Sequence, residues 1–455
     1  MTGFSATGYD SVQSEPADTF RPSHQTAFYA DCSIRCSWPV CPQRQLPGSR
    51  VMASELNYGT SASVRIDVPV TAVLADFPTP RGEPLDDPVA AVAAALLDPL
   101  DFPPMTRSTV PGDQIVLAVD RAVPQAAAVV AGVVHALLDG NAEASDIVII
   151  STDLDPTRLT SLLAEEIRSQ ISVITHDPRA ADALGYLATS QEGKQIRFHR
   201  VLLEADVVLP IGTLRLDEGL SYFGINAGLF PMFSDAETIE RFRSPGTTSS
   251  DVHQRRRSEE AEEAVWLLGS LFTLQVAPGP RDSILHVLAG DARSVAKRGR
   301  ELCKAAWKHQ SPSRAELVVA SIEGGPEHQT WDNFSRALFS ASRAVRDGGA
   351  IVLCTELGCP PGPALQKLTA DGTDDQLMQA LRRDRSEDAV AAALLVTERR
   401  RVHVYLLSHL ASEIVEDLGL GYVASTDDVE RLSRQFESCI LLGNAQHAVL
   451  ATADE

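Results

Sequence analysis

Short apolar runs of strand length alternate with helical stretches along most of this chain, and this alternation constrains the fold more than any other feature. In the first half the apolar runs are 114–120, 146–152, 171–176 and 205–212, and helical stretches at 124–138 and 157–169 lie between them. Continuous apolar strands joined through helices are typical of a parallel sheet that is covered on both faces. The pattern therefore predicts an α/β fold.

The same pattern restarts after a Pro- and Gly-containing segment at 275–282. The next apolar run is 283–290, and a helix capped by Asp291 and ending near Trp307 follows it. Later strand-like runs are 316–322, 350–355, 402–407 and 439–442. We therefore predict two α/β domains with parallel-type sheets and an inter-domain cleft. Their predicted bounds are 52–276 and 277–455.

Residues 1–51 mix Ser, Pro, Gln and Thr without periodicity, which predicts a disordered leader. Met52 is an alternative start of translation, and in that case the leader is not translated. Cys32, Cys36 and Cys41 lie in this segment, but no fourth thiol or nearby histidine completes a metal-ligand set. No metal site is predicted there.

The chain is acidic, with a formal net charge of −21, and this balance excludes a typical nucleic-acid-binding protein. It does not exclude a small anionic ligand, which a few local cations can hold. No apolar run approaches the roughly 20 residues that cross a bilayer, so no membrane partner is expected. The seven scattered cysteines and the polar N-terminus predict a cytoplasmic protein.

Four stretches of the sequence together resemble one enzyme family. They are 86–124, 175–244, 258–276 and 289–307, and the second includes the strand end IG, the segment FGINAGLFPMF and the sequence ETI. In this order they are similar to the lactate racemase family, the 2-hydroxyacid racemases that use a nickel-pincer nucleotide. The resemblance implies the fold of that family from about residue 56 to the end of the chain.

The resemblance also implies where the family's catalytic groups lie, and other residues stand there in this sequence. Asp155 and Asp217 stand near the positions of the two catalytic histidines, Ala227 at the lysine that tethers the cofactor, and Arg243 at the nickel-ligating histidine. Alanine cannot form the tether, and a guanidinium has no lone pair for a metal. Aspartate can still act as a base, although its ordinary pKa near 3.9 makes it a weak one. An N-cap and a turn are the structural alternatives for the two aspartates.

The cofactor-binding positions of the family retain polar or cationic residues. Arg121, Arg200, Asn333 and Arg336 match these positions, so the resemblance implies that they hold an anion. Arg243 is a candidate for binding a substrate carboxylate, because a guanidinium binds it through two parallel hydrogen bonds. For each arginine a structural ion pair or a solvated position remains an alternative.

From these residues we predict a lactate racemase-like protein: a 2-hydroxyacid racemase or epimerase scaffold with substituted catalytic histidines, cofactor lysine and nickel ligand. The alternative is a catalytically inactive family member that binds an anionic small molecule or a nucleotide as a sensor or partner subunit. No cofactor is predicted for this chain itself, the nickel-pincer nucleotide being that of the family. The expected partner is a small anionic ligand such as a 2-hydroxy acid or a nucleotide.

Overall fold

The computed structural model describes residues 51–216, 218–245, 251–369 and 373–453. Nearly all of the predicted leader, residues 1–50, and the candidate base Asp217 lie outside this description. Residues Ser49–Glu455 form one compact unit that contains two six-stranded sheets and three two-stranded sheets. The predicted α/β class is confirmed.

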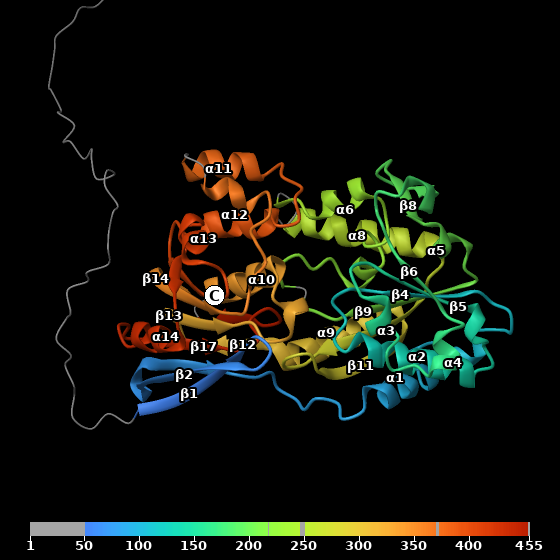
Figure 1. The fold of residues 1–455 in the computed structure, drawn as a ribbon, viewed down its shortest axis with the longest axis horizontal. Helices are drawn as coiled ribbons and strands as arrows, with labels where there is room; N and C mark the ends of the chain where they lie inside the picture. Colours follow the sequence, from blue (N-terminus) through green and yellow to red (C-terminus); the bar gives the residue numbers. More distant parts are fainter. Residues whose placement is uncertain (1–50, 217, 246–250, 370–372, 454–455) are drawn as a thin grey trace, which may run out of the picture. The chain divides into compact units, whose positions relative to one another are not determined.

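The first six-stranded sheet has the order β11-β10-β9-β4-β5-β6 (Figure 1). Its strands are β4 (Ile115–Val119), β5 (Ile147–Ser151), β6 (Ser172–Thr175), β9 (Val207–Thr213), β10 (Phe272–Pro278) and β11 (Ile284–Asp291). Neighbouring strands run parallel except for β10 and β11, which are antiparallel. Sequence reasoning located β11 as an apolar run but gave no sign of its antiparallel direction.

Side chains of β4 alternate between the two faces of this sheet, and both faces are covered. Ile115 and Leu117 pack with α1 (Pro88–Leu97) and α2 (Ala126–Asp139). Val116 and Ala118 pack on the opposite face, which the helices α5 (Arg200–Glu204), α6 (Ala236–Phe242) and α8 (Asp251–Leu268) cover. Burial on both faces explains why the strand is apolar at every position.

The stretch 157–169, predicted as one helix, forms two short helices, α3 (Pro156–Leu159) and α4 (Glu165–Arg168). The Thr160 hydroxyl donates to the Pro156 carbonyl at 3.0 Å, and the Ser161 hydroxyl donates to the Arg158 carbonyl at 2.7 Å. Such bonds from Ser and Thr side chains to the local backbone compete with continued helix formation. This competition accounts for the break.

The second six-stranded sheet has the order β16-β15-β14-β13-β17-β3 and is parallel throughout. Its strands are β3 (Val73–Phe77), β13 (Ala315–Ser321), β14 (Val345–Cys354), β15 (His403–Leu407), β16 (Gly421–Val423) and β17 (Cys439–Leu442). Strand β3 comes from the N-terminal part of the chain, and the predicted boundary at 276/277 falls inside β10. The division into domains and the cleft between them remain predictions.

Both faces of the second sheet are also covered. On one face lies α10 (Trp331–Ser342), against which α12 (Ala389–Glu398) packs, whereas α9 (Ala292–Trp307), which Asp291 caps as predicted, packs on β10 and β11 of the first sheet. On the other face lie the hairpin of β1 (Val51–Tyr58) and β2 (Ala62–Pro69) and the helix α14 (Thr426–Ser433). The remaining elements are β7 (Leu184–Thr189), β8 (Gln195–His199), β12 (Lys308–Ser311), β18 (Val449–Thr452), α11 (Asp374–Leu381) and α13 (Ser412–Asp417).

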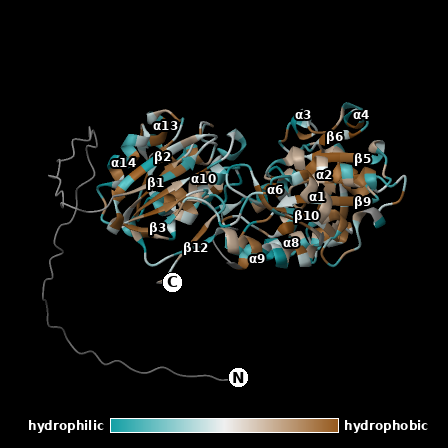
Figure 2. Ribbon diagram, turned by 90° about the horizontal axis from the view of Figure 1, so that it is seen from below, coloured by the Kyte–Doolittle hydropathy of each residue, from teal (hydrophilic) through white to brown (hydrophobic). Residues whose placement is uncertain are grey.

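Figure 2 shows that the strands are mostly hydrophobic, whereas the helices and loops carry both hydrophobic and hydrophilic residues. Among the described residues, every helix is too short or too polar to pass through a bilayer.

Candidate functional site

The order of strands in the first sheet marks one of its ends as a place for a ligand. From β4 the chain continues to β5 and β6 on one side, and β9 later pairs on the other side. In open α/β sheets, ligands bind beyond the carboxyl ends of the strands where the strand order reverses in this way. Asp120 and Arg121 follow β4, and Arg215 follows β9. We call the carboxyl ends of β4 and β9 the first edge.

A cavity of about 170 Å³ lies at the first edge, and we call it the arginine pocket. The charged residues that line it are Arg121, Arg215, Arg243, Arg336, Asp120, Asp332 and Glu387. Three of the four arginines are positions that the sequence singled out, so the fold brings Arg121, Arg243 and Arg336 to one cavity. Arg243 follows α6 directly, and Arg336 lies within α10.

A carboxylate of the chain itself lies between two of these arginines. Glu387, just before α12, accepts a hydrogen bond from Arg121 Nη1 at 3.0 Å and lies 3.4 Å from Arg243 Nη2. Asp153 Oδ2 is 3.4 Å from Arg121 Nη1 on another side. Although burial alone would raise the pKa of the Glu387 carboxyl, the two guanidiniums hold it below its ordinary value. The pair of arginines is therefore arranged to bind a carboxylate.

The other carboxylates of the pocket are also engaged. Asp332 Oδ2 lies 3.0 Å from Arg336 Nη2, one helical turn away on α10. Asp120 accepts a hydrogen bond from the Ala122 N–H at 3.1 Å. Burial raises the pKa of Asp120, against the opposing effects of that hydrogen bond and of the Arg215 charge. Gly228 packs against Asp120, since a Cβ at this position would come within 3.3 Å of Asp120 Oδ2.

The described lining of the arginine pocket does not fit the nickel-pincer nucleotide of the family. Ala227 lines the pocket with a methyl group, and the Arg243 guanidinium is engaged by Glu387. The described lining residues include no histidine, cysteine or lysine. Nickel prefers imidazole and sulfur ligands, and the Met232 thioether is one sulfur without a second such donor in this set.

Three predicted site residues lie outside the lining of the arginine pocket. Asp155 accepts a hydrogen bond from the Thr157 N–H at 2.9 Å and caps α3. An N-cap was the structural alternative to a catalytic role for this residue. Arg200 donates through Nε to the Asp182 carbonyl at 2.8 Å. Asn333 donates to the His328 carbonyl at 2.9 Å. Ligand or catalytic roles for Asp155, Arg200 and Asn333 remain predictions, as does that of Asp217, which the structure does not describe.

Sequence reasoning missed Arg215, Asp153 and Glu387 as site residues. Arg215 and Asp153 each follow a strand of the first sheet by two residues, so the strand-end rule applied to β9 and β5 would have found them. Glu387 belongs to a loop of the second half of the chain. Nothing in its neighbouring sequence indicates that it reaches Arg121.

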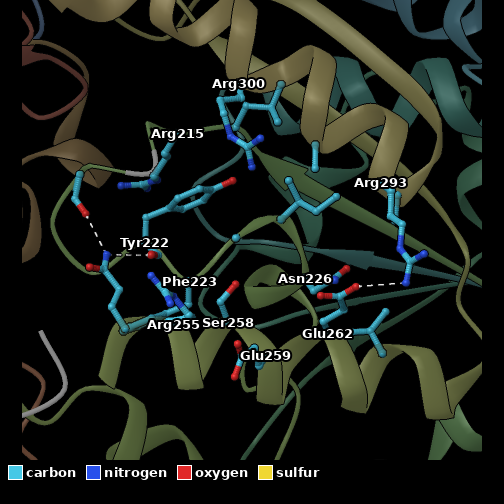
Figure 3. Close-up of a pocket in the computed structure, with 18 of the residues that line it drawn as sticks. Arg215, Tyr222, Phe223, Asn226, Arg255, Ser258, Glu259, Glu262, Arg293 and Arg300 are labelled. Carbon is cyan, nitrogen blue, oxygen red and sulfur yellow. Dashed lines mark hydrogen bonds and ion pairs between the residues drawn. The ribbon is translucent and has the colours of Figure 1, made fainter. Parts of the chain in front are cut away.

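A larger cavity of about 1370 Å³ adjoins the arginine pocket (Figure 3). The two share Arg215 and the segment 221–225, which thus forms a common wall. In the larger cavity Gln254 donates to the Tyr222 carbonyl at 3.1 Å, and Glu262 on α8 pairs with Arg293 on α9 at 3.6 Å. Figure 3 shows Arg215, Tyr222 and Arg300 along one side of this cavity.

The fold and the first edge define a class: an α/β protein with a cation-lined pocket at the strand ends of a parallel sheet. Residues 58–250 match the family model of the lactate racemase N-terminal domain. The lactate racemase of Thermoanaerobacterium thermosaccharolyticum is 19% identical over 199 residues, which are 42% of this chain and 46% of that protein. The chain therefore spans about half the length of the curated relative that it matches.

Two solved structures share the fold. The lactate racemase apoprotein from T. thermosaccharolyticum has a TM-score of 0.73 at 15% identity, over 88% of this chain and 100% of that chain. A Thermotoga maritima protein of known crystal structure has a TM-score of 0.59 at 14% identity, over 82% of this chain and 99% of that chain. The family match identifies a lactate racemase N-terminal domain over residues 58–250, and the two structures show that the chain shares their fold.

Proposed function

We propose that this protein is a lactate racemase-like protein that binds a small organic acid in the arginine pocket without a tethered nickel cofactor. A 2-hydroxy acid is the first candidate ligand, because the family acts on this class. The observation that carries the proposal is the position of Glu387: Arg121 and Arg243 already hold one carboxylate of the chain. We place the protein in the cytoplasm as part of the same proposal.

Displacement of Glu387 by a free carboxylate is physically reasonable. Its side chain is 63% exposed, so solvent can receive it when it leaves the two guanidiniums. Water screens an ion pair in which one partner is this exposed, so breaking it costs on the order of 1 kcal/mol. An incoming ligand that is less exposed in the pocket gains stronger charge-assisted hydrogen bonds from the same two arginines.

The anion-binding part of the proposal is tested by isothermal titration of lactate and of inorganic phosphate into the wild-type protein and into Arg121→Gln. We expect at least one of the two anions to bind, and Arg121→Gln to weaken that binding about tenfold or more. Arg65→Gln is the matched control, because Arg65 pairs with Asp67 on β2 and is not among the residues that line the pocket. No binding of either anion, or an equal loss in both variants, would contradict the proposal.

The metal part is tested by elemental analysis of protein that is co-expressed with the enzymes that make the nickel-pincer nucleotide. We expect far less than one nickel per chain, because Ala227 has no amine and Arg243 has no free lone pair. A family member that loads nickel under the same conditions serves as the control. About one nickel per chain would overturn this part of the proposal.

A second candidate function is acid–base chemistry on a 2-hydroxy acid without nickel. The observation in its favour is Asp120, a pocket carboxyl whose pKa is raised by burial, as suits a general base. The test is exchange of the α-proton of lactate in D₂O, followed by NMR. Exchange that is lost in Asp120→Asn supports catalysis, whereas binding without exchange supports the inactive sensor or partner subunit.

A further inference from the structure

The second six-stranded sheet has a switch point of its own, and it lies next to the arginine pocket. From β13 the chain continues to β14, β15 and β16 on one side, and β17 later pairs on the other. We call the carboxyl ends of β13 and β17 the second edge. Gln446 and His447, which follow β17, line a small cavity of about 20 Å³ together with Arg215, Arg336 and Trp307.

Four buried polar atoms around this small cavity have no partner among the described residues. Two are guanidinium donors, Arg215 Nη1 and Arg336 Nε, and the other two are Gln446 Oε1 and His447 Nδ1. Burial and the Arg215 charge lower the pKa of His447 well below its ordinary value, so its ring is neutral and adds no positive charge. A buried polar group without a partner costs about 1 to 3 kcal/mol, and more when it is charged. The two guanidiniums therefore favour an acceptor that the described residues do not supply.

Both of these arginines also line the arginine pocket. The small cavity has room for about one water molecule, so a ligand group must approach Arg215 and Arg336 from the arginine pocket. The arginine pocket thus presents two pairs of guanidiniums. Arg121 and Arg243 share Glu387, whereas Arg215 and Arg336 each keep a buried N–H without a partner.

The partners of the four arginines indicate how many anionic groups a ligand should bring. Arg121 and Arg243 share Glu387, and Arg121 also lies 3.4 Å from Asp153 Oδ2. A ligand with one carboxylate replaces Glu387 but leaves the buried N–H groups of Arg215 and Arg336 without an acceptor. A ligand with two anionic groups can meet the two arginine pairs separately.

We propose that the ligand of the arginine pocket carries two anionic groups, one held by Arg121 and Arg243 and the other by Arg215 and Arg336. This inference rests on the proposed binding of an organic acid at the same site. The volume of about 170 Å³ limits the ligand to a small molecule, below the range of about 300 to 1,000 Å³ of ordinary ligand pockets. A short hydroxy acid with a second carboxylate or with a phosphate matches this size and charge.

The test compares lactate with malate, which adds a second carboxylate to the same hydroxy acid group. Isothermal titration of the wild-type protein should give an affinity for malate that is about tenfold or more above that for lactate. In Arg215→Gln the ratio of the two affinities should fall to near one. Arg65→Gln should keep the wild-type ratio, and a crystal soaked in malate should show a carboxylate within hydrogen-bond distance of Arg215 Nη1.

The outcomes separate this inference from the proposed function. If lactate or phosphate binds but malate has no advantage, the second anionic site is refuted and the proposed function stands. The same conclusion follows if Arg215→Gln weakens lactate and malate equally. If lactate, malate and phosphate all fail to bind to folded wild-type protein, the proposed function fails and the inference fails with it. If Arg215→Gln does not fold, Arg215→Lys keeps the charge without the planar fork, and its malate-to-lactate ratio should fall about threefold or more.

Discussion

The first and second edges have the same strand topology, but the charged residue that follows the central strand has an exposed partner at the first edge and a buried partner at the second. At the first edge, Arg121 lines a cavity and pairs with the largely exposed Glu387. At the second edge, the Glu323 side chain is 1% exposed and accepts a hydrogen bond from Asn444 Nδ2 at 2.6 Å. Arg281 Nε lies 4.0 Å from the other Glu323 oxygen.

This difference shows that a strand-end charge is not by itself a ligand site. Glu323 follows β13 by two residues, as Arg121 follows β4. The main partner of Glu323 is the side-chain amide of Asn444 in the loop after β17, and Asn444 is as buried as Glu323. Its hydrogen bond therefore stabilises the fold. The partner of Arg121 is a surface carboxylate that a ligand can replace. Accessibility of the partner, and not the strand order, separates the two edges.

The largest expected effect is on stability at the second edge. Glu323→Ala leaves the Asn444 amide without its acceptor and opens a cavity, so the free energy of unfolding should fall by about 2 to 4 kcal/mol. Urea denaturation followed by circular dichroism measures this change. A loss below about 1 kcal/mol would show that the second edge tolerates an unpaired amide and would weaken the contrast between the edges.

The pH dependence of stability gives the next largest effect. Burial raises the pKa of Glu323 to about 7 from the ordinary value of 4.5. Between these pH values the folded chain binds a proton at Glu323 and the unfolded chain does not. Stability from this group should therefore fall as pH rises from about 4.5 to 7, by on the order of 1 to 3 kcal/mol.

The control for this pH effect is Glu323→Gln, which keeps a side-chain acceptor for Asn444 and cannot titrate. The difference in unfolding free energy between wild type and this variant, measured in urea at several pH values, isolates Glu323 from the other acids. A difference that does not change with pH would mean that Glu323 stays ionised in the folded protein.

At the first edge, Glu387→Gln should strengthen lactate binding about threefold to tenfold. The amide competes less well than the carboxylate for Arg121 and Arg243, so a ligand meets less opposition. Titration calorimetry at fixed ionic strength measures the change. Unchanged or weaker binding would show that Glu387 helps to hold the ligand and is not displaced by it.

The smallest expected effect is at Asp155, which the sequence offered as either a base or an N-cap. Asp155→Ala should reduce stability by about 0.5 to 1 kcal/mol through loss of the α3 cap, and Asp155→Asn should retain most of it. The affinity for lactate should be the same in both variants. A strong loss of lactate affinity in Asp155→Asn would show that Asp155 belongs to the ligand site.

The local sequence predicted the positions of strands such as β4 and β5, because burial on both faces of the sheet makes them apolar at nearly every position. It also gave the N-cap of α9 at Asp291, since capping depends on neighbouring residues only. It did not give the pairing of β3 with β17, which are separated by more than 300 positions in the sequence. Strand order depends on long-range contacts that no local pattern encodes.

The sequence alone determined which chemical groups are available, among them the guanidiniums of Arg121, Arg243 and Arg336 and the methyl group of Ala227. The tertiary structure decided which of them meet. It brought Arg121, Arg243 and Arg336 to one cavity with Arg215. It also made Asp155 the N-cap of α3 and placed Glu387 between the guanidiniums of Arg121 and Arg243. The physical reason is that charge–charge contacts between distant segments depend on how sheets and loops pack, and this packing is a property of the whole chain.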